Sequence, residues 1–224
     1  SPWIRHAAVD VPPVEQCRYQ TFRAMLDSST GHEATRPVLV GADERGPLIV
    51  TLGDLGRVAL RADHWRRALC YAQGDSILLL RLPYSSEVPL AAAAVALMSL
   101  GLRVVLPMSY DRKSLPEMAA ATGCRGVLRS TGVADSHPAA ERADELIRGV
   151  AEQLGLDLFC LDQLDWHRSS EGQSQSADFD PSEAVDPKRE VLVLSTSGST
   201  GAPKLVRYTE RALLCVAEAF GLAD

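Results

Sequence analysis

The sequence lacks the features that would tie the protein to nucleic acid or to a membrane. Its formal net charge is -6 at pH 7, and its Lys and Arg residues form no cluster of the kind that binds nucleic acid or anionic lipid. Its longest apolar run, Val88 to Met98, is well short of the roughly 20 residues that span a bilayer. We therefore expect a cytoplasmic protein that binds small molecules or other proteins, with no nucleic acid and no membrane among its partners.

Cysteine and histidine are scarce and have no pattern. The chain has 5 cysteines, which are widely scattered and never spaced as C-x-x-C, so neither a disulfide framework nor a zinc knuckle is indicated. Its 5 histidines have no spacing that builds a metal site. We expect reduced, mostly buried thiols and no metal ligands among these residues.

What the sequence does contain is an alternation of helix and strand patterns, and its 46% hydrophobic residues are ample for a buried core. Uninterrupted apolar runs at residues 77–80, 104–106 and 126–128 are typical of central parallel strands, which are covered on both faces. Helix patterns separate these runs. The order predicts an α/β fold, a mostly parallel sheet with crossover helices.

Shorter patterns complete this outline. We expect a helix over residues 14–26, a hairpin from residues 37–40 and 48–51, and a long helix that Thr51 and Asp54 cap. Ser85 and Ser86 are expected to cap the helix that stops at Gly101, and a capping box at Ser114 and Glu117 to open the next. A helix over residues 139–154 and a strand over 156–161 follow.

The chain is expected to divide at a polar segment. Residues 168–186 are rich in Ser, Gln, Asp and Glu and have little to bury, which is typical of a mobile surface linker. We therefore predict an α/β N-terminal subdomain over residues 1–167 and a linker over 168–189. Residues 190–224 are predicted to form a strand-loop-strand unit and a helix that open the next subdomain.

A loop rich in glycine and hydroxyl groups follows the apolar strand expected at residues 190–195. Its residues are Thr196, Ser197, Gly198, Ser199, Thr200, Gly201, Ala202, Pro203 and Lys204. Glycines permit positive φ, so consecutive backbone N–H groups can converge on one anion, and no Cβ separates the backbone from a phosphate. The hydroxyls add donors, Lys204 adds a positive charge, and Pro203 stiffens the approach of that charge. The loop is therefore a predicted phosphate site.

This loop differs from the P-loop that opens a helix, because Pro203 precedes Lys204 and Leu205 follows it. Residues 205–208 have the pattern of a strand, and Thr209 can cap a helix after it. We expect a strand-loop-strand unit in which N–H groups, hydroxyls and Lys204 hold the phosphate with little help from a helix dipole.

The string from Thr196 to Lys204 resembles the phosphate-loop signature of the adenylate-forming superfamily: acyl-CoA synthetases, nonribosomal-peptide adenylation domains, luciferases and acyl-AMP ligases. Residues 51–55, 74–87 and 100–107 resemble earlier motifs of that superfamily, so the likeness extends from about Val38 to the end of the chain. Two positions depart from it. Leu205 stands where a glycine is usual and Glu210 where a histidine is usual, which weakens inference about subfamily and substrate.

The resemblance implies an incomplete N-terminal domain of the adenylate-forming fold. It implies an enzyme that joins a small-molecule carboxylate to ATP, with Mg2+, and passes the acyl group to a thiol of coenzyme A or of an acyl or peptidyl carrier protein. The residues that would contact the pyrophosphate portion are Thr196, Ser197, Ser199, Thr200 and Lys204. Gly198 and Gly201 would shape the loop, with Lys204 as the catalytic residue. The remaining motifs of the superfamily normally lie downstream, so we expect this chain alone to be inactive.

Two other functions stay open. One is a degenerate adenylation module that acts as a scaffold or as a docking surface for a carrier protein; activity of the full-length protein would exclude it. The other is a stand-alone phosphate-binding α/β domain with a different chemistry, which requires this chain alone to bind nucleotide tightly.

Overall fold

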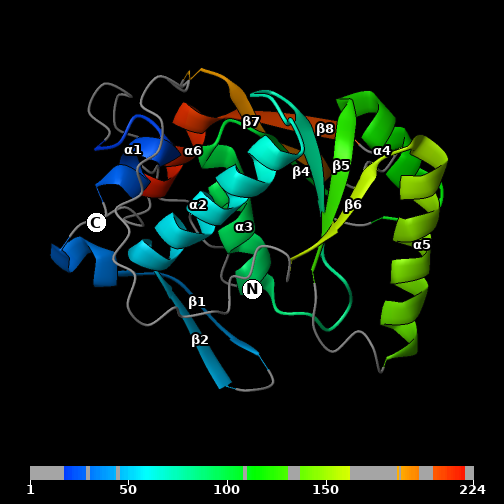
Figure 1. The fold of residues 1–224 in the computed structure, drawn as a ribbon, viewed down its shortest axis with the longest axis horizontal. Helices are drawn as coiled ribbons and strands as arrows, with labels where there is room; N and C mark the ends of the chain where they lie inside the picture. Colours follow the sequence, from blue (N-terminus) through cyan, green and yellow to red (C-terminus); the bar gives the residue numbers. More distant parts are fainter. Residues whose placement is uncertain are drawn as a thin grey trace, which may run out of the picture.

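The main body of the protein is a six-stranded sheet in the order β6-β5-β3-β4-β7-β8, and a two-stranded hairpin, β1-β2, projects from it (Figure 1). The computed structural model describes residues 18–28, 31–43, 46–107, 110–130, 137–161, 186, 188–196 and 204–219. The strands are β1 (Pro37–Asp43), β2 (Gly46–Thr51), β3 (Ser76–Leu80), β4 (Arg103–Pro107), β5 (Cys124–Arg129), β6 (Asp157–Cys160), β7 (Glu190–Thr196) and β8 (Lys204–Thr209). Strands β3 to β7 pair in parallel and β8 pairs antiparallel with β7, so the predicted fold class is confirmed.

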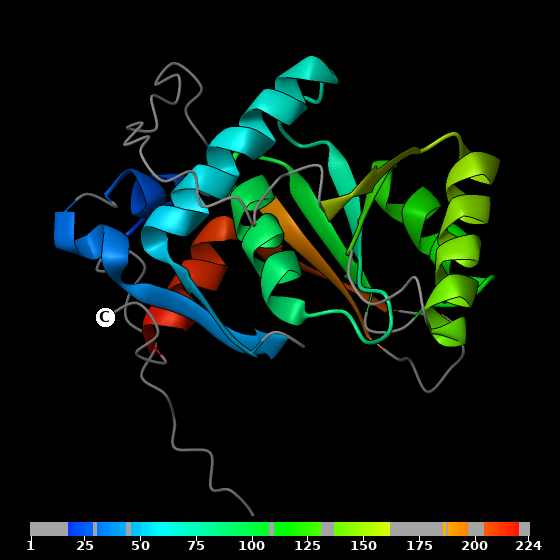
Figure 2. The same cartoon turned by 60° about the horizontal axis from the view of Figure 1, so that its bottom comes forward.

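Helices cover both faces of this sheet, as Figure 2 shows. The helices are α1 (Phe22–Asp27), η2 (Gly31–Thr35), α2 (Leu52–Ala68), α3 (Glu87–Ser99), α4 (Ser114–Thr122), α5 (Pro138–Leu154) and α6 (Glu210–Ala219). Ile77 and Leu79 of β3 pack with α2 and α3 in one core cluster, while Leu78 and Leu80 pack with α4 and α5 in a second. The strand is buried at every position and apolar from Ile77 to Leu80, because both of its faces are covered.

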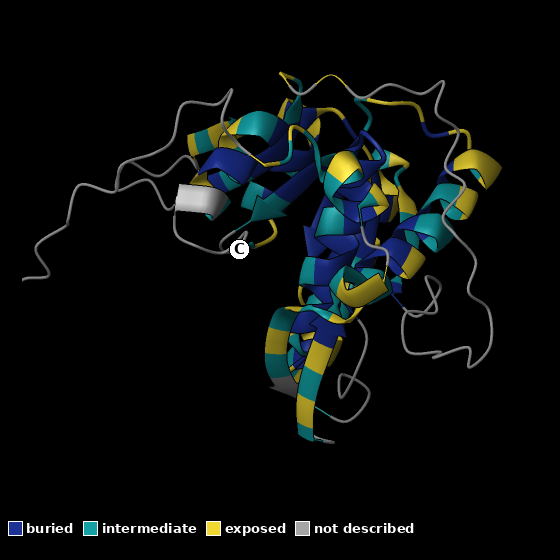
Figure 3. Cartoon of the chain, turned by 90° about the vertical axis from the view of Figure 1, so that its left-hand side faces the viewer, coloured by how far each residue is buried: buried dark blue, intermediate teal, exposed yellow. Residues whose placement is uncertain are grey.

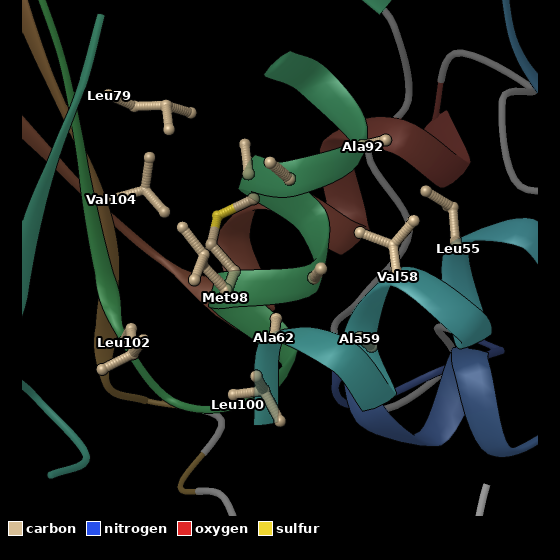
Figure 4. Packing of buried hydrophobic residues seen from close by; sticks show 14 of the residues in the cluster. Leu55, Val58, Ala59, Ala62, Leu79, Ala92, Met98, Leu100, Leu102 and Val104 are labelled. Atoms are coloured by element: carbon tan, nitrogen blue, oxygen red, sulfur yellow. The ribbon is translucent and has the colours of Figure 1, made fainter. Parts of the chain in front are cut away.

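Helix α3 lies between the sheet and α2, and small side chains allow the two helices to approach closely. Ala92 of α3 faces Val58 and Ala59 of α2, while Met98 fills the space toward Val104 of the sheet (Figure 4). Ala92, Val58, Ala59 and Val104 are at most 3% exposed, and Met98 is 6% exposed. This layer explains why almost every residue of α3 is apolar.

Several predicted elements are confirmed. β1 and β2 form the expected antiparallel hairpin, and Thr51 caps α2 through a capping box in which the Asp54 N–H donates to the Thr51 hydroxyl and the Thr51 N–H to the Asp54 carboxylate. The helix expected over residues 14–26 is partly wrong: Thr21 is the N-cap and the helix begins at Phe22. Residues 14–17 lie outside the described part of the chain.

The caps predicted for two other helices are only partly correct. Ser86 is the N-cap residue of α3, but its side chain makes no capping bond, and the Ser85 hydroxyl donates to the Leu82 carbonyl. At α4 the reciprocal bonds join Asp111 and Ser114: the Ser114 N–H donates to Asp111 at 2.8 Å and the Asp111 N–H donates to the Ser114 hydroxyl at 3.0 Å. Aspartate is a strong N-cap residue, so the box lies one turn earlier than Ser114 and Glu117 would place it.

Side chains on the projecting hairpin alternate between exposed and partly buried, as Figure 3 shows. Val40 and Ile49 stand opposite each other on its outer face and are 71% and 55% exposed. At the other end of the chain, β7 and β8 extend the sheet that β3 to β6 begin; the division into subdomains stays a prediction, and residues 162–185 are not described. In the described ranges, no helix is long and apolar enough to cross a membrane.

Candidate functional site

A crevice opens where the connections of β3 and β4 diverge. The segment after β3 leads to α3 on one face of the sheet and the segment after β4 leads to α4 on the other. In such sheets, ligands bind outside the carboxyl ends of the strands at this switch point. A hollow of about 500 Å³ lies there, lined by Arg81 and Pro83 after β3, Pro107 and Tyr110 at the end of β4, and Arg142 of α5.

The hollow has a positive rim. Arg81 and Arg142 are exposed, and the Arg81 guanidinium lies 2.6 Å from the Glu87 carboxylate. The Tyr110 hydroxyl donates to the Arg81 carbonyl at 2.9 Å, and burial raises the pKa of Tyr110 against the opposing charge of Arg81. The Glu87 carboxylate offsets the charge of Arg81, so the exposed guanidinium of Arg142 contributes most to a preference for an anionic ligand.

A strained turn borders the hollow. Tyr84 has a φ of 66° and its side chain is 64% exposed, although the left-handed region is unfavourable for a bulky residue. Its ring lies 4.1 Å from the ring of His137, measured between centroids. Behind it the Ser130 hydroxyl accepts from the Leu82 N–H at 2.8 Å and contacts the Ser85 hydroxyl at 2.7 Å. These buried bonds hold the turn, and residues in such conformations cluster at ligand sites.

The glycine-rich loop begins at the same edge of the sheet. Pro107 at the end of β4 pairs with Ser195 of β7, and Thr196 pairs with Lys204 where β8 starts. The expected strand-loop-strand unit is therefore confirmed, as is the helix cap, since the Ala212 N–H donates to the Thr209 hydroxyl at 3.2 Å. Of the loop, Ser197, Gly198, Ser199, Thr200 and Gly201 lie outside the described residues, so their contact with phosphate stays a prediction.

Glu210 lies at the opposite end of this hairpin and turns into the interior. Its side chain is 0% exposed. The Phe22 N–H donates to one carboxylate oxygen at 2.6 Å, and the Arg189 guanidinium lies 3.6 Å from the other. Burial raises the pKa of Glu210 to about 7 against the effects of Phe22 and Arg189, and burial lowers the pKa of Arg189. At the place of the usual histidine, this chain has a structural carboxylate.

Sequence patterns did not single out the residues that line the hollow. Arg81 had a signal, because it is the first charged residue after the apolar run of β3. Tyr110 and Arg142 had none, since chain topology alone brings them together. As for metals, within the described ranges no three His, Cys, Asp or Glu side chains gather closely enough to hold an ion.

The structure therefore defines an α/β domain with a mostly parallel sheet and a hollow at the carboxyl edge of that sheet, where such sheets bind ligands. Comparison with protein families makes the class specific. The model of the AMP-binding enzyme family matches residues 34–223, and the chain belongs to that family.

Relatives and solved structures agree with this assignment. The acetyl-coenzyme A synthetase of Methanothrix soehngenii is 26% identical over 172 residues, which are 71% of this chain and 25% of that protein. The structure of VinN with 3-methylaspartate has a TM-score of 0.65 at 19% identity and covers 90% of this chain and 50% of that one. The Mycobacterium tuberculosis fatty acyl CoA synthetase has a TM-score of 0.62 at 18% identity, with coverage of 85% and 35%. The chain thus spans half or less of these proteins, and its fold is part of that of the adenylate-forming enzymes.

Proposed function

We propose that the chain carries the triphosphate-binding loop of a ligase that activates a carboxylic acid as an acyl-adenylate, with ATP as the second substrate. The observation that supports this most is the pairing of Thr196 with Lys204. It puts both ends of the loop at the carboxyl edge of the sheet, beside the hollow at the switch point. This is where parallel α/β sheets bind nucleotides.

The β7–β8 ladder supports a role for Lys204 in phosphate binding. Lys204 is the first residue of β8, and its backbone is fixed by pairing with Thr196. A backbone fixed in this way lowers the entropic cost of bringing the ammonium group to a phosphate. There it would neutralise the phosphates while the loop N–H groups and hydroxyls bind the leaving pyrophosphate. The carboxylate attacks the α-phosphorus, and the bond to the β,γ-pyrophosphate breaks.

Mg2+ would supply charge neutralisation on the phosphate oxygens. Within the described residues no cluster of metal ligands is found, and the ion would be held by the nucleotide and by groups elsewhere in the whole protein.

The positive rim of the hollow supports transfer of the acyl group to an anionic thiol acceptor. Arg81 and Arg142 can bind the phosphate groups of coenzyme A. With a carrier protein as acceptor, they can bind the phosphate of its phosphopantetheine arm and its acidic surface. Alanine at both positions should raise the KM for the acceptor and leave adenylation unchanged. Equal KM values for the acceptor in the variant and the wild type would show that the hollow does not bind the acceptor.

The experiment that tests the proposal is carboxylate-dependent ATP–pyrophosphate exchange. It is measured on the full reading frame and on the 224-residue chain, with aryl, fatty and amino acids as substrates. We expect exchange by the full-length protein only, and its loss in Lys204→Ala. Lys188→Ala, which changes an exposed lysine near the far end of the same hairpin, is the matched control. A well-folded full-length protein that is silent across the panel would instead favour the scaffold function.

A further inference from the structure

We propose that Glu210 is a proton-operated latch: with a proton on its carboxyl group it holds the base of the β7–β8 hairpin closed against α1, and without that proton the joint loosens. Glu210 is then a positioning residue for the loop at the other end of the hairpin. The consequence for the loop rests on the proposed function, whereas the latch itself does not.

The joint connects parts of the chain that are far apart in sequence. The Glu210 N–H donates to the Arg189 carbonyl at 3.2 Å, which closes the base of the hairpin. The Glu210 carboxylate accepts from the Phe22 N–H, which ties the hairpin to α1. The Arg189 guanidinium donates to the Gln73 side chain at 3.1 Å, next to the start of β3. Glu210 and Arg189 therefore anchor the hairpin to two other elements.

The carboxylate is poorly matched to its surroundings when it carries a charge. An ionised carboxylate has two acceptor oxygens; here Oε1 accepts from the Phe22 N–H, while Oε2 has no hydrogen-bond partner among the residues that the structure describes. Among the same residues the Arg189 Nη2 and Nε atoms have no hydrogen-bond partner either, and Nη2 lies 3.6 Å from Oε2. The two charges attract each other without a hydrogen bond, so the attraction does not offset the loss of water around both groups.

Two neighbours lower the pKa of Glu210: the Phe22 N–H of α1, and Arg189, which faces it from the turn before β7. Asp186 acts on Arg189, whose pKa it raises. Burial outweighs these contacts, so the pKa of Glu210 rises to about 7. The stabilisation of the joint by the latch is therefore complete below the ordinary pKa of glutamate. It declines as the pH rises and reaches its minimum above about pH 7.

Hydrogen–deuterium exchange of the 224-residue chain tests the latch without any activity assay. Exchange is followed in peptides over residues 18–28 and 186–219, corrected for the intrinsic effect of pH, with β3 as internal reference. Between about pH 6 and pH 8 we expect opening of the joint in the wild type to increase about tenfold and then level off. Glu210→Gln stays neutral and keeps an acceptor for Phe22, so its exchange should remain low and flat.

Glu190→Gln is the matched control, since Glu190 is the adjacent, partly exposed carboxylate on the same hairpin and pairs with Arg207 at 2.9 Å. This variant should keep the wild-type pH dependence. The latch is refuted if exchange at the wild-type joint does not rise with pH, a result that needs no variant. It is also refuted if exchange in Glu210→Gln still rises with pH, or if exchange in β3 rises in parallel with that of the joint. In the full-length ligase, the KM for ATP should rise with pH in the wild type and not in Glu210→Gln. Absence of ligase activity would count against the proposed function alone.

Discussion

Thr196 and Lys204 stand opposite each other on the last rung of the ladder between β7 and β8. Opposed residues of an antiparallel pair are only about 5 Å apart between Cα atoms, so the glycine-rich segment between them starts and ends at nearly the same point. Consecutive backbone N–H groups in a glycine-rich turn can converge on one anion, and this closure is the arrangement that the proposed phosphate site requires. Lys204, moreover, belongs to a strand, and its position does not depend on the loop's own conformation.

Replacing Lys204 by alanine should reduce carboxylate-dependent pyrophosphate exchange by about 10² to 10³, the usual effect of removing one group that stabilises transition-state charge. Because Lys204 is exposed, stability in urea should change by no more than about 0.5 kcal/mol. Full activity in this variant would show that the phosphates are bound elsewhere.

Gly101→Ala should destabilise the protein by roughly 1 to 3 kcal/mol. Gly101 has a φ of 87°, and a Cβ there would collide with the Arg189 guanidinium and with Gln73. Gly149→Ala, in the exposed face of α5 with open space around it, should instead stabilise by about 0.5 to 1 kcal/mol. Urea unfolding measures both, and equal signs would contradict the assignment of Gly101 to a crowded site.

The stability of the wild type relative to Glu210→Gln should depend on pH. The folded-state pKa of Glu210, about 7, lies above that of an unfolded glutamate, so the folded chain binds the additional proton. The stabilisation is fully present below about pH 4.5, is lost as the pH rises through 7, and amounts to roughly 3 kcal/mol. Thermal or urea unfolding of both proteins from pH 5 to 8 measures the difference. If the free energies of unfolding of the two proteins change with pH in parallel, the Glu210 carboxylate is exposed to solvent.

Thr51→Ala should cost about 1 kcal/mol, because it removes the hydroxyl that accepts the Asp54 N–H at the start of α2. Thr35→Ala is the control, since Thr35 is an exposed threonine at the end of η2. This substitution should change the free energy of unfolding by no more than about 0.5 kcal/mol. A cost for Thr51→Ala no larger than that of the control would mean that water caps α2 equally well.

Alkylation should distinguish the cysteines. Cys70 is exposed and Cys124 is buried, and burial raises the pKa of the Cys124 thiol to about 11. Since the thiolate is the reactive form, iodoacetamide near pH 8 should modify Cys70 rapidly and Cys124 only on unfolding. Peptide mass spectrometry reports each site, and rapid labelling of Cys124 in the native protein would contradict its placement at the start of β5.

The elements that the sequence predicted best are those in which the local pattern and the tertiary environment agree. The apolar run of β3 required burial on both faces, and the Thr51 box needed only residues within one turn. Side-chain capping failed where a tertiary contact competed: Ser85 bonds to the Leu82 carbonyl and to Ser130, and no pattern near Ser85 indicates a contact with Ser130.

The same distinction applies to the site. The glycine-rich loop has a local signature, which predicted a strand on each side of it; the strands extend one residue further into the loop than expected, to Thr196 and from Lys204. The hollow is made by residues from the ends of β3 and β4 and from α5, which only strand order brings together. Likewise, the inward turn of Glu210 depends on Phe22 and Arg189, which lie in separate parts of the sequence.

The strand order also has a kinetic consequence. Strands β3 to β6 are joined by successive helical crossovers, whereas β7 must return to the edge of β4, so that Leu192 meets Val104. This pairing closes the longest stretch of chain in the sheet, and long closures are the slow, entropically costly steps of folding. During synthesis the strand that leads into the glycine-rich loop therefore emerges after its parallel partner β4 and before its antiparallel partner β8.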